Sequence, residues 1–294
     1  MDILQKLTEE LQVKKWQVEA AVNLIDEGNT IPFISRYRKE VTGALNDEQL
    51  RKLDERLAYL RNLEDKKAQV LSSIEEQGKL TDELRAQIEA AQTQVAVDDL
   101  YRPYRPKRRT RATMAKEKGL EGLANIILLQ MTKNPLEEEA KAYLSEEKGV
   151  AAVEEALAGA KDIIAESISD EADYRTYIRT ITLKEGMITS EAKDETKESV
   201  YENYYHFSQP LNKMMGHRTL ALNRGEAEKM LTVKIEAPEE KILRYLEKQV
   251  VKRDNPHTSG ALKETIQDSY HRLIAPAIER EIRNLLTEQA EEGA

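Results

Sequence analysis

A stripe of leucines spaced three or four residues apart constrains the fold of this chain more than any other feature. Its members, and the apolar residues that continue it, are Leu50, Leu53, Leu57, Leu60, Leu63, Val70, Leu71 and Ile74. Residues at this spacing lie on one side of an α-helix. Asn46 is a favourable N-cap and Gly78 a C-terminal stop, so the sequence predicts one long helix between them. Because clean heptads do not extend beyond this span, we expect the stripe to pack against helices of the same chain.

The composition indicates that most of the chain is built in the same way. Charged residues make up 34% and aromatic residues 5%, which is typical of long amphipathic helices, and the 40% hydrophobic content supports a packed core. A strict apolar alternation at Leu231, Val233 and Ile235, together with the surroundings of Ile188, predicts two short paired strands. We therefore expect an all-α fold, an elongated multi-helix bundle with at most a small two-stranded β element.

Helical periodicity divides the chain into three expected regions. Short helices at 3–11 and 15–27, and a third after Pro32, predict a trihelical unit of helix-turn-helix type over 1–45. Such a unit either reads DNA or has a purely structural role. A helical bundle is expected over 46–255, with helices near 81–92, 111–118, 119–131, 135–145, 150–169 and 239–251. A long C-terminal helix is expected within 256–294, covering 259–289 with a kink at Pro276.

Several classes of protein are disfavoured by composition. The chain has no cysteine, which excludes disulfides and cysteine-ligated zinc and favours a reducing cytoplasm. The first residues, MDILQKLTEELQ, lack the basic and apolar regions of a signal peptide, and no run reaches transmembrane length. The net charge of -9 argues against a surface that is basic throughout. Any nucleic-acid contact must therefore come from a local cluster of positive charge.

The strongest such cluster is a basic loop at 101–111, where Pro103 and Pro106 forbid a regular helix. Between 101 and 120 the only acidic residue is Glu117. The basic residues of this stretch, six in the loop and two on the predicted helix that follows, are Arg102, Arg105, Lys107, Arg108, Arg109, Arg111, Lys116 and Lys118. Arginine binds phosphate through two parallel hydrogen bonds, and Tyr101 and Tyr104 are suited to stacking on bases. The alternative is that these cations pair with acidic helices of the same chain while the tyrosines pin the loop to the bundle.

Two smaller clusters carry the same ambiguity. Arg36, Arg38 and Lys39 end the predicted trihelical unit, where they either meet phosphates or bases or form a solvated helical face. His217 and Arg218 form a pair that would hold a phosphate if it lay near a helix end; the alternative is that it caps or braces a turn.

Catalytic and metal-binding patterns are not evident in the sequence. The histidines show no metal-ligand spacing of the HExxH kind, and there is no phosphate-cradling glycine loop or nucleophile elbow; they are His206, His217, His257 and His271. Asp98 and Asp99 are adjacent, so their side chains point apart and make a poor acid/base pair. We expect no enzymatic activity, no cofactor and no metal site.

Three long stretches resemble segments of the bacterial Tex transcription accessory proteins. They are IPFISRYRKEVTGALNDEQLRKLDERLAYLRNLE (31–64), DDLYRPYRPKRRTRATMAKEKGLEGLA (98–124) and HRTLALNRGEAEKMLTVKI (217–235). The resemblance extends over nearly the whole chain. It implies that such proteins, which are also similar to a eukaryotic transcription elongation factor, continue into an RNase-H-like domain, helix-hairpin-helix units and an OB-fold. We expect this chain to be a fragment whose last helix leads to those domains.

The resemblance implies a function in transcription. We expect a non-catalytic scaffold with auxiliary phosphate contacts to RNA or DNA. The alternative is a protein-interaction module that docks RNA polymerase or other transcription factors without touching nucleic acid.

Overall fold

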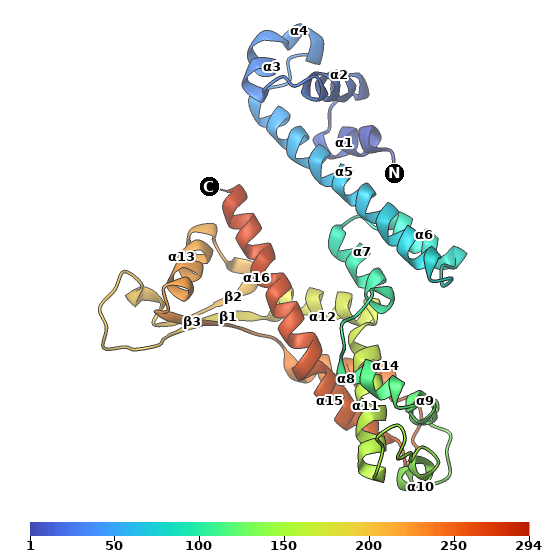
Figure 1. Ribbon diagram of the computed structural model, residues 1–294. Coiled ribbons are helices and arrows are strands. Elements are labelled where there is room, and N and C mark those ends of the chain that lie inside the picture. The colour runs from blue at the N-terminus through green and yellow to red at the C-terminus, as the bar shows by residue number, and fades with distance from the viewer. Residues whose placement is uncertain (294) are drawn as a thin grey trace. The chain divides into compact units, whose positions relative to one another are not determined.

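The structure, a computed structural model, describes residues 1–293 and consists mostly of helices (Figure 1). The predicted all-α class is confirmed. The chain forms two compact units, Met1–Tyr104 and a second that begins at Arg105. Each has its own hydrophobic core. The three regions expected from the sequence, 1–45, 46–255 and 256–294, stay a prediction.

The first unit is entirely helical. Its elements are α1 (Ile3–Leu11), α2 (Lys15–Asp26), α3 (Ile31–Tyr37), α4 (Lys39–Thr42), α5 (Asp47–Glu76), α6 (Asp82–Ala90), α7 (Gln94–Tyr101) and the 3-10 turn η1 (Arg102–Tyr104). The predicted long helix is α5, and Asn46 caps it reciprocally with Gln49: Asn46 Oδ1 accepts from Gln49 N at 2.8 Å, and Gln49 Oε1 accepts from Asn46 N at 3.0 Å.

The predicted leucine stripe of α5 forms the centre of this first core. Leu50, Leu53, Leu60 and Leu63 are fully buried, in contact with helices of the same unit. Lys67 continues the stripe and is 3% exposed, and its ammonium group donates to the Glu89 carbonyl oxygen at 2.8 Å. A lysine is tolerated at this buried position because its charged end has hydrogen-bond partners.

The second unit combines helices with a small sheet. Its elements are α8 (Arg111–Glu117), α9 (Glu121–Leu129), α10 (Leu136–Lys141), α11 (Val153–Ser169), α12 (Ala172–Glu185), β1 (Met187–Ala192), η2 (Glu202–Tyr204), β2 (His206–Pro210), η3 (Leu211–Lys213), α13 (Gly216–Ala227), β3 (Leu231–Glu236), α14 (Glu239–Val250), α15 (Ser259–Asp268), the π-helical segment η4 (Ser269–Ile274) and α16 (Ala275–Glu292). Helix α11 lies at the centre of this unit and contacts α8, α9, α10 and α15.

The sheet has three antiparallel strands in the order β2-β1-β3. The expected pairing of the Ile188 region with 231–235 is confirmed, and Ile188 faces Ile235 in the register. The sequence prediction of at most two strands missed β2. That strand, HFSQP, lacks a strict apolar alternation and ends in proline, so it carries little local signal for a strand.

Four described helices were also missing from the sequence prediction, namely α4, α7, α12 and α13. The C-terminal helix was expected over 259–289 with a kink at Pro276, and it is irregular just before that proline, because η4 separates α15 from α16. Proline has no N–H to donate to the preceding turn and its ring crowds that turn, so a wider π-turn at this position is physically reasonable.

Candidate nucleic-acid interface

The basic loop is divided between the two compact units, and within the second unit Lys107 is turned inward. Its ammonium group contacts Glu166 of α11 at 2.9 Å and also pairs with Asp170. The Lys107 side chain is 23% exposed, and the two carboxylates are less exposed still. A partly buried cation held by two carboxylates is poorly placed to meet an outside anion, so Lys107 attaches the loop to α11.

The arginines around Lys107 are oriented differently. Arg105, Arg108, Arg109 and Arg111 are exposed. Arg109 is 72% exposed and lies 3.5 Å from Glu117, which is itself 64% exposed. Exposed ion pairs of this kind contribute little and exchange readily with solvent. Among the described residues, Arg108 has no ion pair, so its guanidinium group is available to an external phosphate.

The aromatic residues of the loop lie in the first unit. Tyr101 and Tyr104 are partly buried against its core, and the Tyr101 hydroxyl lies 2.8 Å from Ser73 Oγ. The Tyr104 carbonyl oxygen accepts a hydrogen bond from Gln77 Nε2 at 2.8 Å. Both tyrosines therefore tie the segment to α5. Arg102, which follows Tyr101 in η1, is also partly buried.

The second predicted cluster combines cations with aromatic rings on α3. The Arg38 guanidinium lies 4.8 Å from the centre of the Phe33 ring, and that of Arg36 lies 6.0 Å from the Tyr37 ring. Tyr37 is 56% exposed, and Lys39 is exposed as well. Cations beside exposed rings are a common feature of surfaces that bind single-stranded nucleic acids.

Trp16 is an exposed aromatic residue of the first unit that sequence reasoning did not single out. It lies on α2, is 51% exposed and is the only tryptophan in the chain. A tryptophan among charged and polar residues near the start of a short helix is unusual, because large aromatic side chains are mostly buried. That sequence context could have marked Trp16 as a candidate binding residue.

The third cluster is separated by the fold. His217 is exposed in the first turn of α13, whereas Arg218 is partly buried and donates to Gln209 Oε1 at 3.0 Å. The Arg218 guanidinium also lies 5.8 Å from the Phe207 ring, so it braces β2 against α13. Only His217 faces solvent.

An acidic row on α11 explains how the loop and α8 are held. Asp162, Glu166 and Asp170 are four residues apart, on one side of the helix. Burial raises the pKa of the Asp162 carboxyl, opposed by the nearby Arg272 and Arg111. The Arg272 side chain also hydrogen-bonds Asp268 of α15, which lowers the pKa of Asp268. Cations and carboxylates therefore largely neutralise one another along this row.

Two further observations concern metals and membranes. Within residues 1–293, the metal-competent group is Glu191, Glu195 and His206, all exposed. The His206 ring nitrogens already lie 2.9 Å and 2.7 Å from the two carboxylates, so the three side chains satisfy one another. In the same residues, every helix is too short or too polar to cross a bilayer.

Comparison with known proteins relates both units to one family. Residues 1–75 match the family described as Tex-like protein N-terminal domain, and residues 130–294 match the Tex central region-like family. The transcriptional accessory protein Tex of Neisseria gonorrhoeae is 40% identical over 301 residues, covering 100% of this chain and 39% of that protein. Protein YdcI of Bacillus subtilis is 48% identical over 293 residues, covering 99% of this chain and 41% of that protein.

A human relative is more distant. S1 RNA-binding domain-containing protein 1 is 29% identical over 306 residues, covering 99% of this chain and 30% of that protein. The chain thus spans about two fifths of the length of the bacterial relatives named above. Because it matches both the N-terminal domain and the central region of Tex proteins, the chain belongs to the Tex family.

Proposed function

We propose that this chain is a non-catalytic helical scaffold of a transcription accessory protein, and that it adds phosphate contacts to RNA or DNA. The observation that carries the proposal is the contrast within the basic loop. Lys107 pairs with two carboxylates, whereas Arg108 is exposed and has no ion pair among the described residues. The names of relatives, a transcriptional accessory protein and an S1 RNA-binding domain-containing protein, support a role near nucleic acids.

The contacts made through such arginines are electrostatic. Each phosphate neutralised releases condensed counterions, so the logarithm of the binding constant falls linearly with the logarithm of the salt concentration. A few exposed arginines give weak binding that is steeply sensitive to salt and has little sequence preference. This is the behaviour expected of an auxiliary contact in a scaffold.

The test is a fluorescence anisotropy titration of the chain with a single-stranded RNA and a duplex DNA at 50 and 150 mM salt. The variant Arg108→Glu/Arg109→Glu reverses charge on the exposed side of the loop. The control Arg51→Glu/Arg85→Glu makes the same change of charge on α5 and α6, where the two side chains are 64% and 43% exposed. We expect the loop variant to bind at least about tenfold more weakly than the control.

The control matters because the chain is acidic overall. Any charge reversal weakens binding through the net charge, and only a difference between the two variants assigns the contact to the loop. Equal binding of both variants would reject the loop as a phosphate contact.

A second candidate, docking of a protein such as RNA polymerase, is favoured by a different surface. Leu129 and Met131 are 63% and 62% exposed on either side of Gln130. Large exposed apolar side chains close together are typical of protein contacts. If this surface docks RNA polymerase, Leu129→Ser/Met131→Ser should abolish binding to the purified enzyme and leave the nucleic-acid titration unchanged.

A further inference from the structure

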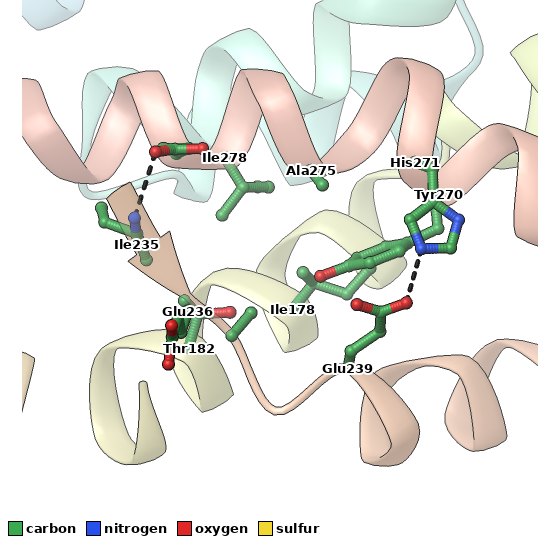
Figure 2. A pocket seen from close by; sticks show the side chains of 11 residues that line it. Ile178, Thr182, Ile235, Glu236, Glu239, Tyr270, His271, Ala275 and Ile278 are labelled. Atoms are coloured by element: carbon green, nitrogen blue, oxygen red, sulfur yellow. Dashed lines mark hydrogen bonds and ion pairs between the residues drawn. The ribbon is translucent and has the colours of Figure 1, made fainter. Parts of the chain in front are cut away.

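A cavity of about 420 Å³ lies in the second unit, between α12, the connection from β3 to α14, and the helix formed by η4 and α16 (Figure 2). Residues far apart in the sequence meet there; the ones that matter for its chemistry are Ile178, Thr182, Glu239, Tyr270, Ile278 and Glu279. Its volume is in the range of small-molecule binding sites.

Two hydroxyl groups on the cavity lining have no hydrogen-bond partner among the described residues, and that of Thr182 is buried. Thr182 is 1% exposed, and its Oγ1 has no hydrogen-bond partner. Tyr270 is 3% exposed, and among the described residues its hydroxyl makes no hydrogen bond. Figure 2 shows the Tyr270 ring reaching across the cavity from its helix. Buried polar groups are nearly always hydrogen-bonded, so the unpartnered Thr182 hydroxyl at this cavity indicates that something else bonds to it.

The charge around the cavity is negative. Glu236, Glu239 and Glu279 contribute to its lining, which contains no lysine or arginine. Glu279 Oε1 accepts from the main-chain N of Ile235 at 3.1 Å, which fixes its carboxylate beside the cavity. His271 is the one lining residue that can become positive, and it is bonded to Glu239 at 2.5 Å.

The helix that supplies Tyr270 and His271 has an unusual local geometry. Both lie in the π-helical segment η4, whose first residue, Ser269, donates from its buried hydroxyl to the Ala165 carbonyl oxygen at 2.6 Å. This bond anchors the wide turn to α11. Single π-turns within helices occur frequently at functional sites, where they reposition side chains toward a ligand.

We infer that this cavity binds a primary ammonium group carried on an aliphatic chain. The carboxylates of Glu239 and Glu279 supply the counter-charge, and the hydroxyl oxygens of Tyr270 and Thr182 accept hydrogen bonds from the N–H groups. Ile178 and Ile278 provide apolar surface for the methylene groups. The Tyr270 ring adds an aromatic face for the cation.

Other ligand classes fit less well. An anion would face three carboxylates and no compensating lysine or arginine. A bare divalent cation needs about six oxygen ligands close together, and the apolar walls of this much larger space cannot supply them. Burial and the nearby Glu239 and Glu279 raise the pKa of Tyr270 to about 12, so its hydroxyl stays protonated and neutral at physiological pH.

The test is an NMR titration of the ¹⁵N-labelled chain with three probes of equal length, 1-aminopentane, 1-pentanol and pentanoate. We expect 1-aminopentane alone to shift the amide signals of residues around Tyr270 in a saturable manner. Tyr270→Phe and Glu279→Gln should each weaken this binding by about tenfold or more, since each removes a polar partner of a charged group. Glu240→Gln, an exposed neighbour outside the cavity lining, should leave it unchanged.

A second arm distinguishes the two sources of an alkylammonium group. Nα-acetyl-lysine methylamide represents a lysine side chain of a polypeptide, and 1,5-diaminopentane represents a free amine. Saturable binding of either one supports the site, and the tighter of the two identifies the source.

The inference is overturned if 1-pentanol binds as well as 1-aminopentane, or if no probe gives saturable shifts around the cavity up to 20 mM. It is also overturned if Tyr270→Phe, shown to be folded by an unchanged melting temperature, binds as the parent does. Nucleic-acid binding through the loop is a separate property, because its arginines do not line the cavity.

Discussion

The imidazole of His271 and the carboxylate of Glu239 join η4 to α14 through a contact of 2.5 Å between Nε2 and Oε1. The hydrogen bond to Glu239 raises the pKa of His271, aided by the Gln267 carbonyl oxygen and opposed by partial burial. The folded-state pKa therefore lies above the unfolded value. It follows that this pair stabilises the fold fully below the unfolded pKa of His271, and that the stabilisation is lost as pH rises through the folded pKa.

We predict that Glu239→Gln lowers the pKa of His271 toward the ordinary histidine value, as measured by NMR titration of its ring Cε1–H signal. The melting temperature of the variant should also lie further below that of the parent at pH 5.5 than at pH 8.5. Glu240→Gln, the adjacent position on α14, is the matched control and should leave the His271 titration unchanged. A parent-like His271 pKa in Glu239→Gln would contradict the assignment.

Lys107 and Arg108 are adjacent, and we predict opposite consequences for their removal. Lys107→Ala takes away the cation that faces Glu166 and Asp170, and should reduce the free energy of unfolding by about 1–2 kcal/mol. Arg108→Ala should change it by less than about 0.5 kcal/mol, because the side chain is exposed and unpaired among the described residues.

The same two variants should behave in the reverse way toward RNA. Arg108→Ala should reduce the slope of the salt dependence by about one unit, whereas Lys107→Ala should leave it nearly unchanged. Urea denaturation and anisotropy titrations at several salt concentrations measure the two effects. If Arg108→Ala proved the more destabilising of the pair, the division of the loop into inward and outward cations would be wrong.

The extent to which this structure could be predicted depends on how local each signal is. The leucine stripe of α5 and its Asn46 cap are encoded within one helix, and the pairing of β1 with β3 follows from the alternation at 231–235. Both were predicted correctly. The strand β2 is paired through its main chain, with little side-chain pattern, so its sequence did not identify it.

Prediction of the candidate sites was also limited to what neighbouring residues in the sequence could show. The sequence located the basic loop, but it left open which cations face outward, because the carboxylates that hold Lys107 lie some sixty residues away on α11. Within η4, Ile274 is fully buried and Leu273 only partly so. The π-turn at η4 shifts the helical register there, and it also forms one wall of the cavity.

Gly43 and Gly28 offer a matched test of packing in the first unit. Both have positive φ, +68° and +93°, which disfavours any side chain. A Cβ at Gly43 would lie 2.6 Å from Trp16 Cη2 and 2.7 Å from Gln17 Nε2, whereas one at Gly28 would meet nothing within 4 Å. We predict losses of about 1 kcal/mol for Gly28→Ala and about 2 kcal/mol or more for Gly43→Ala.

The single tryptophan allows this to be measured selectively. Trp16 fluorescence reports unfolding of the first unit, and its emission should shift in Gly43→Ala but not in Gly28→Ala. Equal losses of stability in the two variants would show that the contact with Trp16 adds nothing to the backbone strain.

Gln130 ends α9 in the left-handed conformation, with φ of +56°, and its side chain joins two distant segments. Its Oε1 accepts from the main-chain N of Lys252 and Arg253 at 3.0 Å and 3.2 Å, and its Nε2 donates to the Val250 carbonyl oxygen at 2.8 Å. The residue is 5% exposed. Removing the amide would leave these main-chain groups without their partner, and such groups are costly when buried.

We predict that Gln130→Leu lowers the free energy of unfolding by about 2–4 kcal/mol, measured by urea denaturation followed by circular dichroism. Gln130→Asn separates two explanations, because asparagine tolerates positive φ but its side chain is one methylene shorter. If loss of the hydrogen bonds causes the destabilisation, Gln130→Asn should be nearly as destabilising as Gln130→Leu. If Gln130→Asn is instead about as stable as the parent, the destabilisation of Gln130→Leu comes from the backbone conformation. Gln267→Leu, at an exposed position of α15, controls for the exchange of an amide for an apolar side chain and should change stability by less than about 0.5 kcal/mol.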